Sequence, residues 1–236
     1  MLTACTIIAC NYLPFVRVLA DSFFVHHPND RFTVLLVDDE QRQLDVPDAR
    51  IEWCHLADLA IDQREVHRLA GIYDVTELAT AVKPLFLQHL LERGASSVIY
   101  LDPDIRIYAP LDEAASRALQ HGIVLTPHTT QPIPQDGRQI DPLVLLASGA
   151  YNLGFIAVGA SAGEFLEWWW QATRRYALID LPNGLFTDQR WIDYVPSLFE
   201  PHLLKDPTWN VAYWNCLLYT CPSPRDRTRS RMPSSA

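Results

Sequence analysis

Asp102 and Asp104 are separated by a single proline, and they follow the apolar, β-branched run Ser97–Leu101. In extended chain, residues i and i+2 point to the same side, so both carboxylates can face one point beyond the end of a strand. Two hard oxygen ligands on a short loop suit Mg²⁺ or Mn²⁺, which completes its coordination shell with waters and substrate phosphates. We therefore predict a metal that neutralises a diphosphate. The alternative is that the two aspartates only form a turn around the proline.

Two further polar pairs follow other predicted strands. Asp38 and Asp39 come directly after the second strand. An acidic side chain at that place can bind a ribose hydroxyl or a base edge, and a helix N-cap is the alternative. Asn11 and Tyr12 come after the first strand, so we expect them at the same edge of the sheet. Tyr12 could stack on a base, or it could close the edge of the core.

Lys83 directly precedes Pro84. The proline disfavours the α conformation for Lys83 and suits the first turn of the helix that follows. We therefore expect Lys83 at a bend near a helix start, where its ammonium could face phosphate. The alternative is an ordinary solvated lysine.

Polar side chains also interrupt two later segments. Asn152 lies beside a glycine at the start of a predicted buried strand, and this pattern alone is weak evidence for a site. Asp188 and Gln189 lie where a helix is predicted to begin. Capping of that helix is the alternative explanation for Asp188.

Strand and helix signals alternate along the chain. Strands are predicted at Thr6–Cys10, Phe32–Val37, Ser97–Leu101, Ile123–Thr126 and Gly154–Val158. Helices are predicted at Phe15–His26, Asp74–Val82, Pro84–Arg93 and Ala162–Tyr176. This alternation is typical of an α/β domain with a mainly parallel sheet flanked by helices. The last helix carries three consecutive tryptophans, which spread over most of its circumference, so at least one must lie near the rim or in a contact with a partner.

The bulk composition narrows the class of protein. With 236 residues, 49% hydrophobic and 20% charged, the chain suits one large α/β domain. A net charge of -9 argues against nucleic acid as the main partner. The five cysteines are scattered and form no CxxC pair, which disfavours a disulfide framework and a structural zinc site. A reducing, cytoplasmic compartment fits this pattern.

Membrane insertion is not expected. Met1 leads directly into an apolar strand pattern without a basic region, which is unlike a signal peptide. The stretch Pro142–Gly163 carries no charge and is about as long as a membrane span. Because polar residues and glycines interrupt it, we predict two buried strands joined by a turn instead.

The composition changes near the C-terminus. Pro222–Ala236 is rich in proline, serine and arginine, and its four arginines and one aspartate give a net charge of +3. A segment with so little to bury is expected to be disordered. We expect a domain over residues 1–215 that is incomplete at its C-terminus, followed by a non-native tail over 216–236.

Three motifs, taken in order, resemble those of GT-A glycosyltransferases. They are Ile99–Ile105, Tyr151–Phe155 and Thr187–Trp191, and the resemblance covers most of the chain from Thr6 to Asn215. The similarity is greatest to the glycogenin and lipopolysaccharide galactosyltransferase type and to related bacterial enzymes. It implies a Rossmann-like nucleotide-diphospho-sugar transferase fold. It also implies a nucleotide-sugar donor, usually a UDP-sugar, with Mn²⁺ or Mg²⁺ bound by Asp102 and Asp104.

The resemblance also implies roles for the donor-side residues. Asn11, Tyr12 and Asp38 match the nucleoside pocket of the family. Lys83 falls where the family usually carries a basic donor-binding residue, most often arginine. We therefore group these four residues with donor binding.

The residues of the two later motifs are implied to act at the sugar. Asn152 would bind the donor, while Asp188 and Gln189 would be the catalytic residues and line the sugar and the acceptor side. The relatives retain the anomeric configuration, and Gln189 matches their polar group near the anomeric carbon. The family usually supplies a third metal ligand, a histidine, beyond the last motif. His202 comes too early in the chain and lacks the usual glycine-rich context.

We therefore predict a metal-dependent, retaining hexosyltransferase. Its acceptor would be a carbohydrate or a glycolipid, in cell-surface polysaccharide or lipopolysaccharide assembly, and peripheral contact with a membrane is compatible with this role. One alternative is a phosphohydrolase of the haloacid dehalogenase type, although Arg106 stands where that motif normally has Thr or Val. A second alternative is a sugar-nucleotide-binding remnant without turnover.

Overall fold

A computed structural model describes residues 2–38, 48–133 and 141–212 of the chain. Within these residues, seven strands form one sheet in the order β3-β2-β1-β4-β6-β5-β9. The strands are β1 (Thr3–Ile8), β2 (Arg31–Leu36), β3 (Ile51–His55), β4 (Ser97–Leu101), β5 (Ile123–Pro127), β6 (Tyr151–Gly159) and β9 (His202–Leu203). A separate hairpin joins β7 (Ile179–Asp180) to β8 (Leu185–Phe186).

The strand directions bring many loops to one edge of the sheet. Strands β3, β2, β1 and β4 are parallel, and β6 runs antiparallel to both β4 and β5. The predicted mainly parallel sheet is therefore confirmed. The carboxyl ends of β1, β2, β4 and β5 meet the start of β6 at the same edge. Between β1 and β4 the strand order reverses, and α/β sheets usually bind ligands beside such a reversal.

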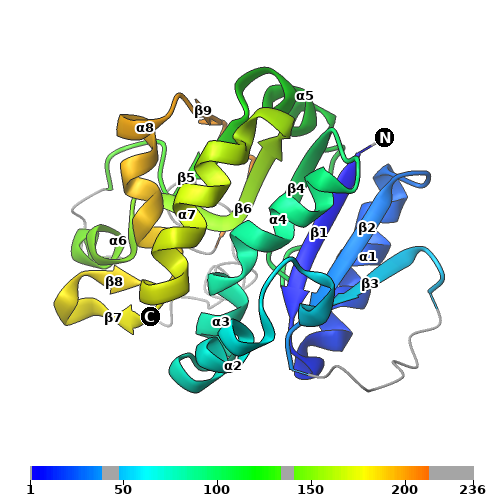
Figure 1. The fold of residues 1–236 in the computed structure, drawn as a ribbon. Helices are drawn as coiled ribbons and strands as arrows, with labels where there is room; N and C mark the ends of the chain where they lie inside the picture. The colour runs from blue at the N-terminus through cyan, green and yellow to red at the C-terminus, as the bar shows by residue number, and fades with distance from the viewer. Residues whose placement is uncertain (1, 39–47, 134–140, 213–236) are drawn as a thin grey trace, which may run out of the picture.

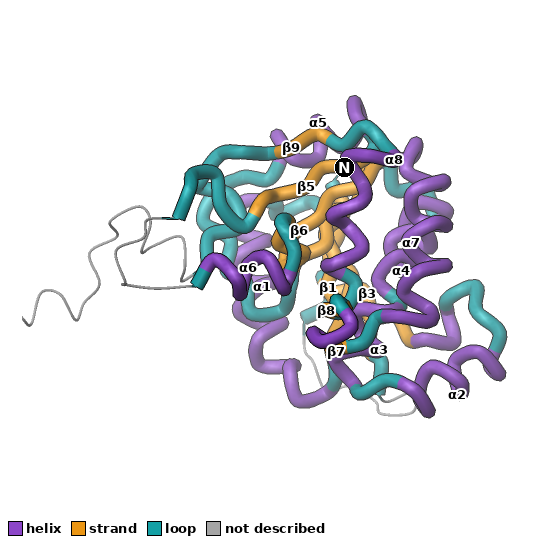
Figure 2. Tube along the Cα trace, turned by 90° about the vertical axis from the view of Figure 1, so that its left-hand side faces the viewer, coloured by secondary structure: helices purple, strands orange, loops and turns teal. Residues whose placement is uncertain are grey.

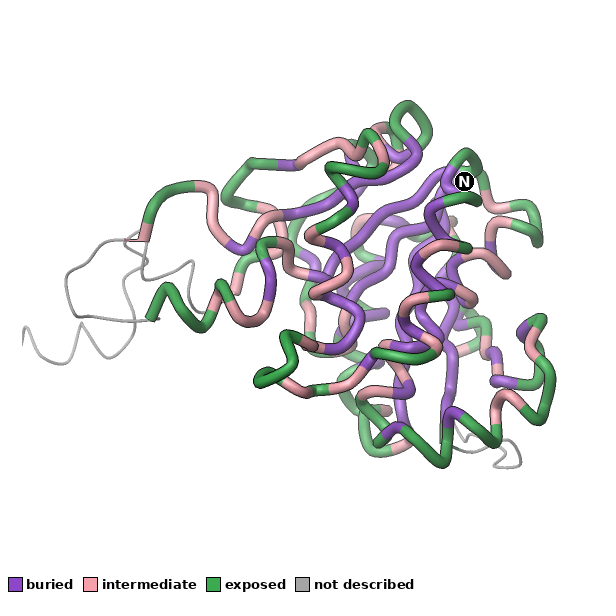
Figure 3. Tube along the Cα trace, turned by 60° about the vertical axis from the view of Figure 1, so that its left-hand side comes forward, coloured by how far each residue is buried: buried purple, intermediate pink, exposed green. Residues whose placement is uncertain are grey.

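Helices cover both faces of the sheet (Figures 1 and 2). The helices are α1 (Leu13–His26), α2 (Gln63–Ile72), α3 (Val75–Ala81), α4 (Lys83–Glu92), α5 (Asp112–His121), α6 (Pro142–Ser148), α7 (Gly163–Tyr176) and α8 (Val195–Leu198). Helices α2, α3, α4 and α7 contribute to the core on one face, and α1 and α5 to the core on the other. Figure 3 shows the strands buried between the exposed outer surfaces of these helices.

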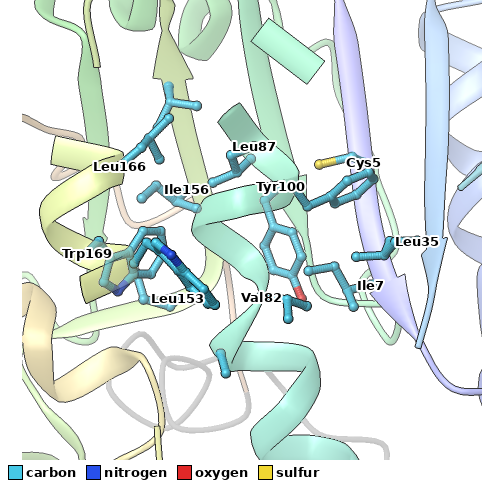
Figure 4. Close-up of a cluster of buried hydrophobic side chains, with 14 of the residues drawn as sticks. Cys5, Ile7, Leu35, Val82, Leu87, Tyr100, Leu153, Ile156, Leu166 and Trp169 are labelled. Carbon is cyan, nitrogen blue, oxygen red and sulfur yellow. The ribbon is translucent and has the colours of Figure 1, made fainter. Parts of the chain in front are cut away.

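The first core surrounds Tyr100 on β4. Figure 4 shows its ring among apolar side chains from β1, α4, β6 and α7, including Ile7, Leu87, Leu153 and Trp169. Trp169 is fully buried, while its neighbour Trp168 is only partly buried and packs at the margin. The predicted rim position for one tryptophan is thus confirmed. Because Tyr100 carries a hydroxyl into this core, it must find a polar partner there.

Local signals explain the paired helices before β4. Asp74 caps α3 through a hydrogen bond from the Glu77 backbone, and the Glu77 side chain accepts from the Asp74 backbone in return. Lys83 and Pro84 form the first turn of α4, where proline leaves no hydrogen bond unmade. The expectation that the proline keeps Lys83 out of helical conformation is therefore wrong. The helix break falls at Val82 instead.

The expected pair of strands within Pro142–Gly163 is also wrong. The first half forms helix α6, and only the second half forms strand β6. Asp141 caps this helix by accepting a hydrogen bond from the Leu143 backbone at 2.9 Å, and Gly149 ends it at a φ of +112°. No helix in the described ranges is long and apolar enough to cross a membrane. The proposed tail, residues 216–236, lies outside the described residues.

Candidate functional site

The two aspartates leave the sheet directly after β4. The Asp102 backbone donates to the Gly154 carbonyl at 2.8 Å, which extends the pairing of β4 with β6 by one residue. The Ile105 backbone then donates to the Asp102 carbonyl at 3.1 Å and closes a turn. This turn leaves the Asp102 side chain partly buried and Asp104 exposed. Both residues line the same cavity.

The cavity beside these aspartates has a volume of about 760 Å³, which is within the usual range for small-ligand sites. Its walls come from the loop after β4, the start of β6 and the segment 208–212. Polar and aromatic side chains converge on it, namely Asp102, Asp104, Asn152, Asn210, Tyr108, Phe155 and Trp209. The cavity lies where β4 ends and β6 begins.

Gly154 leaves space for the Asp102 carboxylate. A Cβ at this position would lie 3.2 Å from Asp102 Oδ2 and 3.2 Å from Asn152 Oδ1. Contacts this short are tighter than ordinary van der Waals distances, so any larger residue would displace the carboxylate or the amide. The Asn152 oxygen itself accepts a hydrogen bond from the Gly154 backbone at 3.0 Å. Carboxylate and amide oxygens gathered around a glycine fit a hard divalent cation.

A buried ion pair lies beneath this cavity. Lys83 is 2% exposed, and its Nζ is 2.8 Å from Oδ2 of Asp188, which is 1% exposed. The same ammonium donates to the Leu153 carbonyl at 3.2 Å and lies 4.2 Å from the centre of the Tyr100 ring. Lys83 is therefore not a solvated surface lysine. Its charge is neutralised within the protein, next to the residues that precede the aspartate loop.

The electrostatics of Asp102 follow from this environment. Burial raises the pKa of Asp102, and the negative charges of Asp188 and Asp104 act in the same direction. The positive charge of Lys83 and a hydrogen bond of 2.8 Å from the Tyr100 hydroxyl oppose that rise in pKa. Burial also raises the pKa of Tyr100 well above its usual value, so Tyr100 remains a hydrogen-bond donor. Excess negative charge at Asp102 favours a cation at this point.

Asp188 and Gln189 form internal contacts. Gln189 is 8% exposed, and its amide accepts from the Leu153 backbone at 3.1 Å and donates to the Ser148 carbonyl at 2.8 Å. Asp188 stands at the start of a 3-10 helix, but its carboxylate makes no capping bond there. Capping therefore does not explain Asp188. The two residues connect the end of α6, the start of β6 and the N-terminus of α4.

The residues assigned to a nucleoside lie at the same edge of the sheet, beyond β1 and β2. Asn11 and Tyr12 are exposed on a 3-10 helix (Cys10–Tyr12), and the Tyr12 ring lies 5.3 Å from that of Phe15. The Asp38 carboxylate accepts hydrogen bonds from the Cys10 backbone at 2.9 and 3.1 Å, so it caps this helix. Asp38 is exposed as well. Asp39 lies outside the described residues.

Three site residues are absent from the sequence prediction. Tyr100 could have been found, because it precedes Asp102 by two residues and points to the same side of the strand. Asn210 and Thr126 carry no local signal, since they meet only through the fold. His202 begins β9, and its ring stacks on His121 at 4.9 Å instead of facing the aspartates. Within the described ranges, no cluster of three or more metal-ligating His, Cys, Asp or Glu side chains occurs.

A second cavity, of about 510 Å³, adjoins the start of β6 at Tyr151. It is lined by the end of β5, helix α6, the start of β6 and part of the 3-10 helix Gln189–Tyr194. Tyr151 and Lys205 line it together with the ion pair between Arg190 and Asp193. The Asp193 carboxylate also accepts a hydrogen bond from the Ala150 backbone at 2.8 Å. The two cavities therefore meet the same strand, β6, at neighbouring residues.

Comparison with known proteins shows which of them this chain resembles. No family model matches the chain. The uncharacterized protein YfnF of Bacillus subtilis (strain 168) is 30% identical over 168 residues, which are 66% of this chain and 53% of YfnF. The chain thus spans about half the length of that curated relative.

Solved structures of glycosyltransferases share the fold. The galactosyltransferase LgtC, crystallised with donor and acceptor sugar analogues, superposes with a TM-score of 0.56 at 16% identity. That alignment covers 98% of this chain and 84% of LgtC. The glycosyltransferase GlyE of Streptococcus pneumoniae TIGR4 gives a TM-score of 0.51 at 14% identity, over 88% of this chain and 46% of GlyE. The predicted GT-A-like fold, resembling the LgtC type, is confirmed.

Proposed function

We propose that this chain, which has the fold of LgtC-type glycosyltransferases, transfers a sugar from a nucleotide-diphospho-sugar to a carbohydrate or glycolipid acceptor. The observation that carries the proposal is the placement of Asp102 and Asp104, which directly follow β4, on one cavity between the loop after β4 and the start of β6. The donor that best fits the resemblance is a UDP-sugar. The setting we propose is a cytoplasmic step in bacterial cell-surface polysaccharide or lipopolysaccharide assembly.

Asp102 and Asp104 are the residues that would hold Mn²⁺ or Mg²⁺. A cation bound there supplies positive charge that stabilises a departing nucleoside diphosphate. The chain's own contribution is to keep the Asp102 carboxylate in place through the Tyr100 hydroxyl and to leave room for it at Gly154. Asp104 is exposed and is free to turn toward the same ligand.

The buried pair of Lys83 and Asp188 supports the site from beneath. Lys83 offsets the negative charge of Asp102 and Asp188, so that the loop after β4 can hold its carboxylates close together. We propose that Lys83 acts on the donor through this charge balance and not by direct contact with phosphate. Its 2% exposure supports this view, because phosphate has no access to the ammonium in this conformation.

Asp188 and Gln189 would act on the sugar through β6. Gln189 holds the backbone of Leu153, which adjoins Asn152, and Asn152 lines the cavity. We therefore propose that Asn152 contacts the donor sugar directly, while Asp188 and Gln189 fix the strand that carries it. The resemblance implies retention of the anomeric configuration, and we propose that outcome.

The second cavity is our candidate for the acceptor. It lies against the same start of β6, and its partly buried Tyr151 and its Arg190–Asp193 pair offer an apolar ring beside hydrogen-bonding charges. Sugars present both an apolar face and hydroxyl groups, so this combination suits a saccharide.

A donor-turnover assay tests the proposed function. The chain is incubated with Mn²⁺, a panel of nucleotide-sugars and candidate acceptors, and release of nucleoside diphosphate and sugar transfer are measured. We expect diphosphate release from one donor that Asp102→Asn abolishes. Release of inorganic phosphate from sugar phosphates would instead support a phosphohydrolase. Donor binding without transfer or hydrolysis would indicate a binding remnant.

A further inference from the structure

The segment that follows β9 crosses the edge of the sheet and forms one wall of the larger cavity. It begins where the Leu204 backbone donates to the Leu125 carbonyl at 2.9 Å, and it reaches the cavity at residues 208–212. The Trp209 ring packs edge-on against Phe155 at 5.6 Å. This contact anchors the segment to β6 without any help from its neighbour Asn210.

The side-chain amide of Asn210 joins two strands of the sheet. Its Nδ2 donates to Thr126 Oγ1 at 2.9 Å and to the Asn152 carbonyl at 3.0 Å. The Thr126 hydroxyl also donates to the Asn152 carbonyl, at 3.3 Å. The end of β5, the start of β6 and the segment after β9 are thus connected at one amide. Of these three residues, Thr126 is fully buried.

The other end of the Asn210 amide lies next to Gly154, as does the Asp102 carboxylate. Asn210 Oδ1 lies 3.5 Å from the point that a Gly154 Cβ would occupy, and Asp102 Oδ2 and Asn152 Oδ1 lie 3.2 Å from the same point. Three side-chain oxygens from three segments therefore surround one glycine. Asn210 Oδ1 accepts no hydrogen bond from the residues that the structure describes. The amide therefore uses its donor on the strands and places its oxygen beside Gly154, as Asp102 does.

The backbone of Asn210 is in the left-handed region, with a φ of +50°. Among the described residues, Thr187 is the only other non-glycine residue with positive φ, and it adjoins Asp188. Asparagine tolerates this conformation better than most residues, but glycine tolerates it best. The backbone conformation therefore favours glycine at this position, whereas the hydrogen bonds require the asparagine amide. Substitutions can separate these two roles.

We propose that Asn210 is a positioning residue of the aspartate site: its amide fixes Asn152 and Gly154 as the wall against which the Asp102 carboxylate lies. This inference rests on the proposed function, because the wall matters only where Asp102 holds a cation and Asn152 contacts a donor. Residues that orient ligands of a metal typically change metal affinity or activity by about 10- to 100-fold when they are replaced.

Variants of Asn210 separate its two roles. Asn210→Gly keeps the left-handed backbone and removes the amide, whereas Asn210→Asp keeps a side-chain oxygen but loses the Nδ2 donor. Asn183→Ala is the matched control, since it removes an exposed amide that bonds to Asp180 at 2.7 Å and does not line the cavity. Mn²⁺ binding is measured by electron paramagnetic resonance, UDP binding by calorimetry with Mn²⁺, and folding by thermal melting.

We expect Asn210→Gly to melt within a few degrees of the wild type and to lose about 10- to 100-fold in Mn²⁺ and UDP affinity. Asn210→Asp should lose as much, and Asn183→Ala should bind like the wild type. Wild-type affinity in a folded Asn210→Gly would overturn the inference and leave only a backbone role. If Asn210→Gly does not fold, Thr126→Val tests the same amide from its partner, and unchanged affinity there would also overturn the inference. A wild type that binds neither Mn²⁺ nor UDP would refute the proposed function itself, and the positioning role with it.

Discussion

Replacing Lys83 by methionine should destabilise the protein strongly. The substitution preserves the length and apolar stem of the side chain, but it leaves the Asp188 carboxylate buried at 1% exposure without its partner. Removing one member of a buried ion pair typically costs about 3–5 kcal/mol. The Leu153 carbonyl would also lose its hydrogen-bond donor, and the Tyr100 ring its cation. Since domains of this kind unfold with about 5–15 kcal/mol in total, the loss should be plain in urea unfolding.

A double variant separates the ion pair from simple packing. Lys83→Met combined with Asp188→Asn removes both charges, so the double variant should recover part of the lost unfolding free energy. The interaction free energy from the double-mutant cycle should be about 1–3 kcal/mol. Arg117→Met is the matched control, because Arg117 pairs with Glu113 at 3.6 Å on the exposed surface of α5. Such a pair contributes less than about 1 kcal/mol. The reasoning is refuted if Lys83→Met unfolds like the wild type, or if the double variant loses the full sum of the single losses.

Three further substitutions probe the candidate site, and a fourth, Gly71→Ala, serves as a control. Because burial raises the native pKa of Asp102 above its unfolded value, its contribution to stability is present at low pH and is lost as pH rises through the native pKa. Asp102→Asn, assayed by unfolding in a chelator, should therefore gain stability over the wild type at neutral pH, and this gain should shrink on acidification. Gly154→Ala should weaken Mn²⁺-dependent UDP binding in calorimetry, whereas Gly71→Ala, on open helix surface, should only raise the melting temperature slightly. Gln189→Glu replaces the amide donor to the Ser148 carbonyl with a carboxylate oxygen. This should lower the free energy of unfolding in urea by about 1–3 kcal/mol.

Strands with a continuous apolar pattern were predictable from the sequence. Ser97–Leu101 forms β4 with the predicted bounds, because β-branched and aromatic residues enrich this short run and all of them are buried in the sheet. Short polar helices were not predicted. Helix α2 (Gln63–Ile72) has only one buried residue, Leu69, so an apolar repeat hardly exists in its sequence. Helix α6 was predicted as a strand for the opposite reason: its sequence is apolar, and a short apolar run fits a helix or a strand equally well.

The candidate site also contains residues that the local sequence predicts and residues that come together only through the fold. Asp102 and Asp104 could be predicted because their geometry depends on a single strand end. The pairing of Lys83 with Asp188 joins residues more than a hundred positions apart in the chain, and the resemblance alone brought both into one site. Asn210 meets Thr126 and Asn152 only after β5, β6 and β9 have assembled. Nothing in the local sequence around Asn210 indicates that contact.

Calorimetric titration of UDP in the presence and absence of Mn²⁺ tests the central claim most directly. We expect the wild type to bind UDP only with Mn²⁺, and we expect Asp102→Asn and Asp104→Asn to remove this metal-dependent binding while the melting profile stays cooperative. Metal-dependent UDP binding that survives in both folded variants would contradict the assignment of the two aspartates as the cation site.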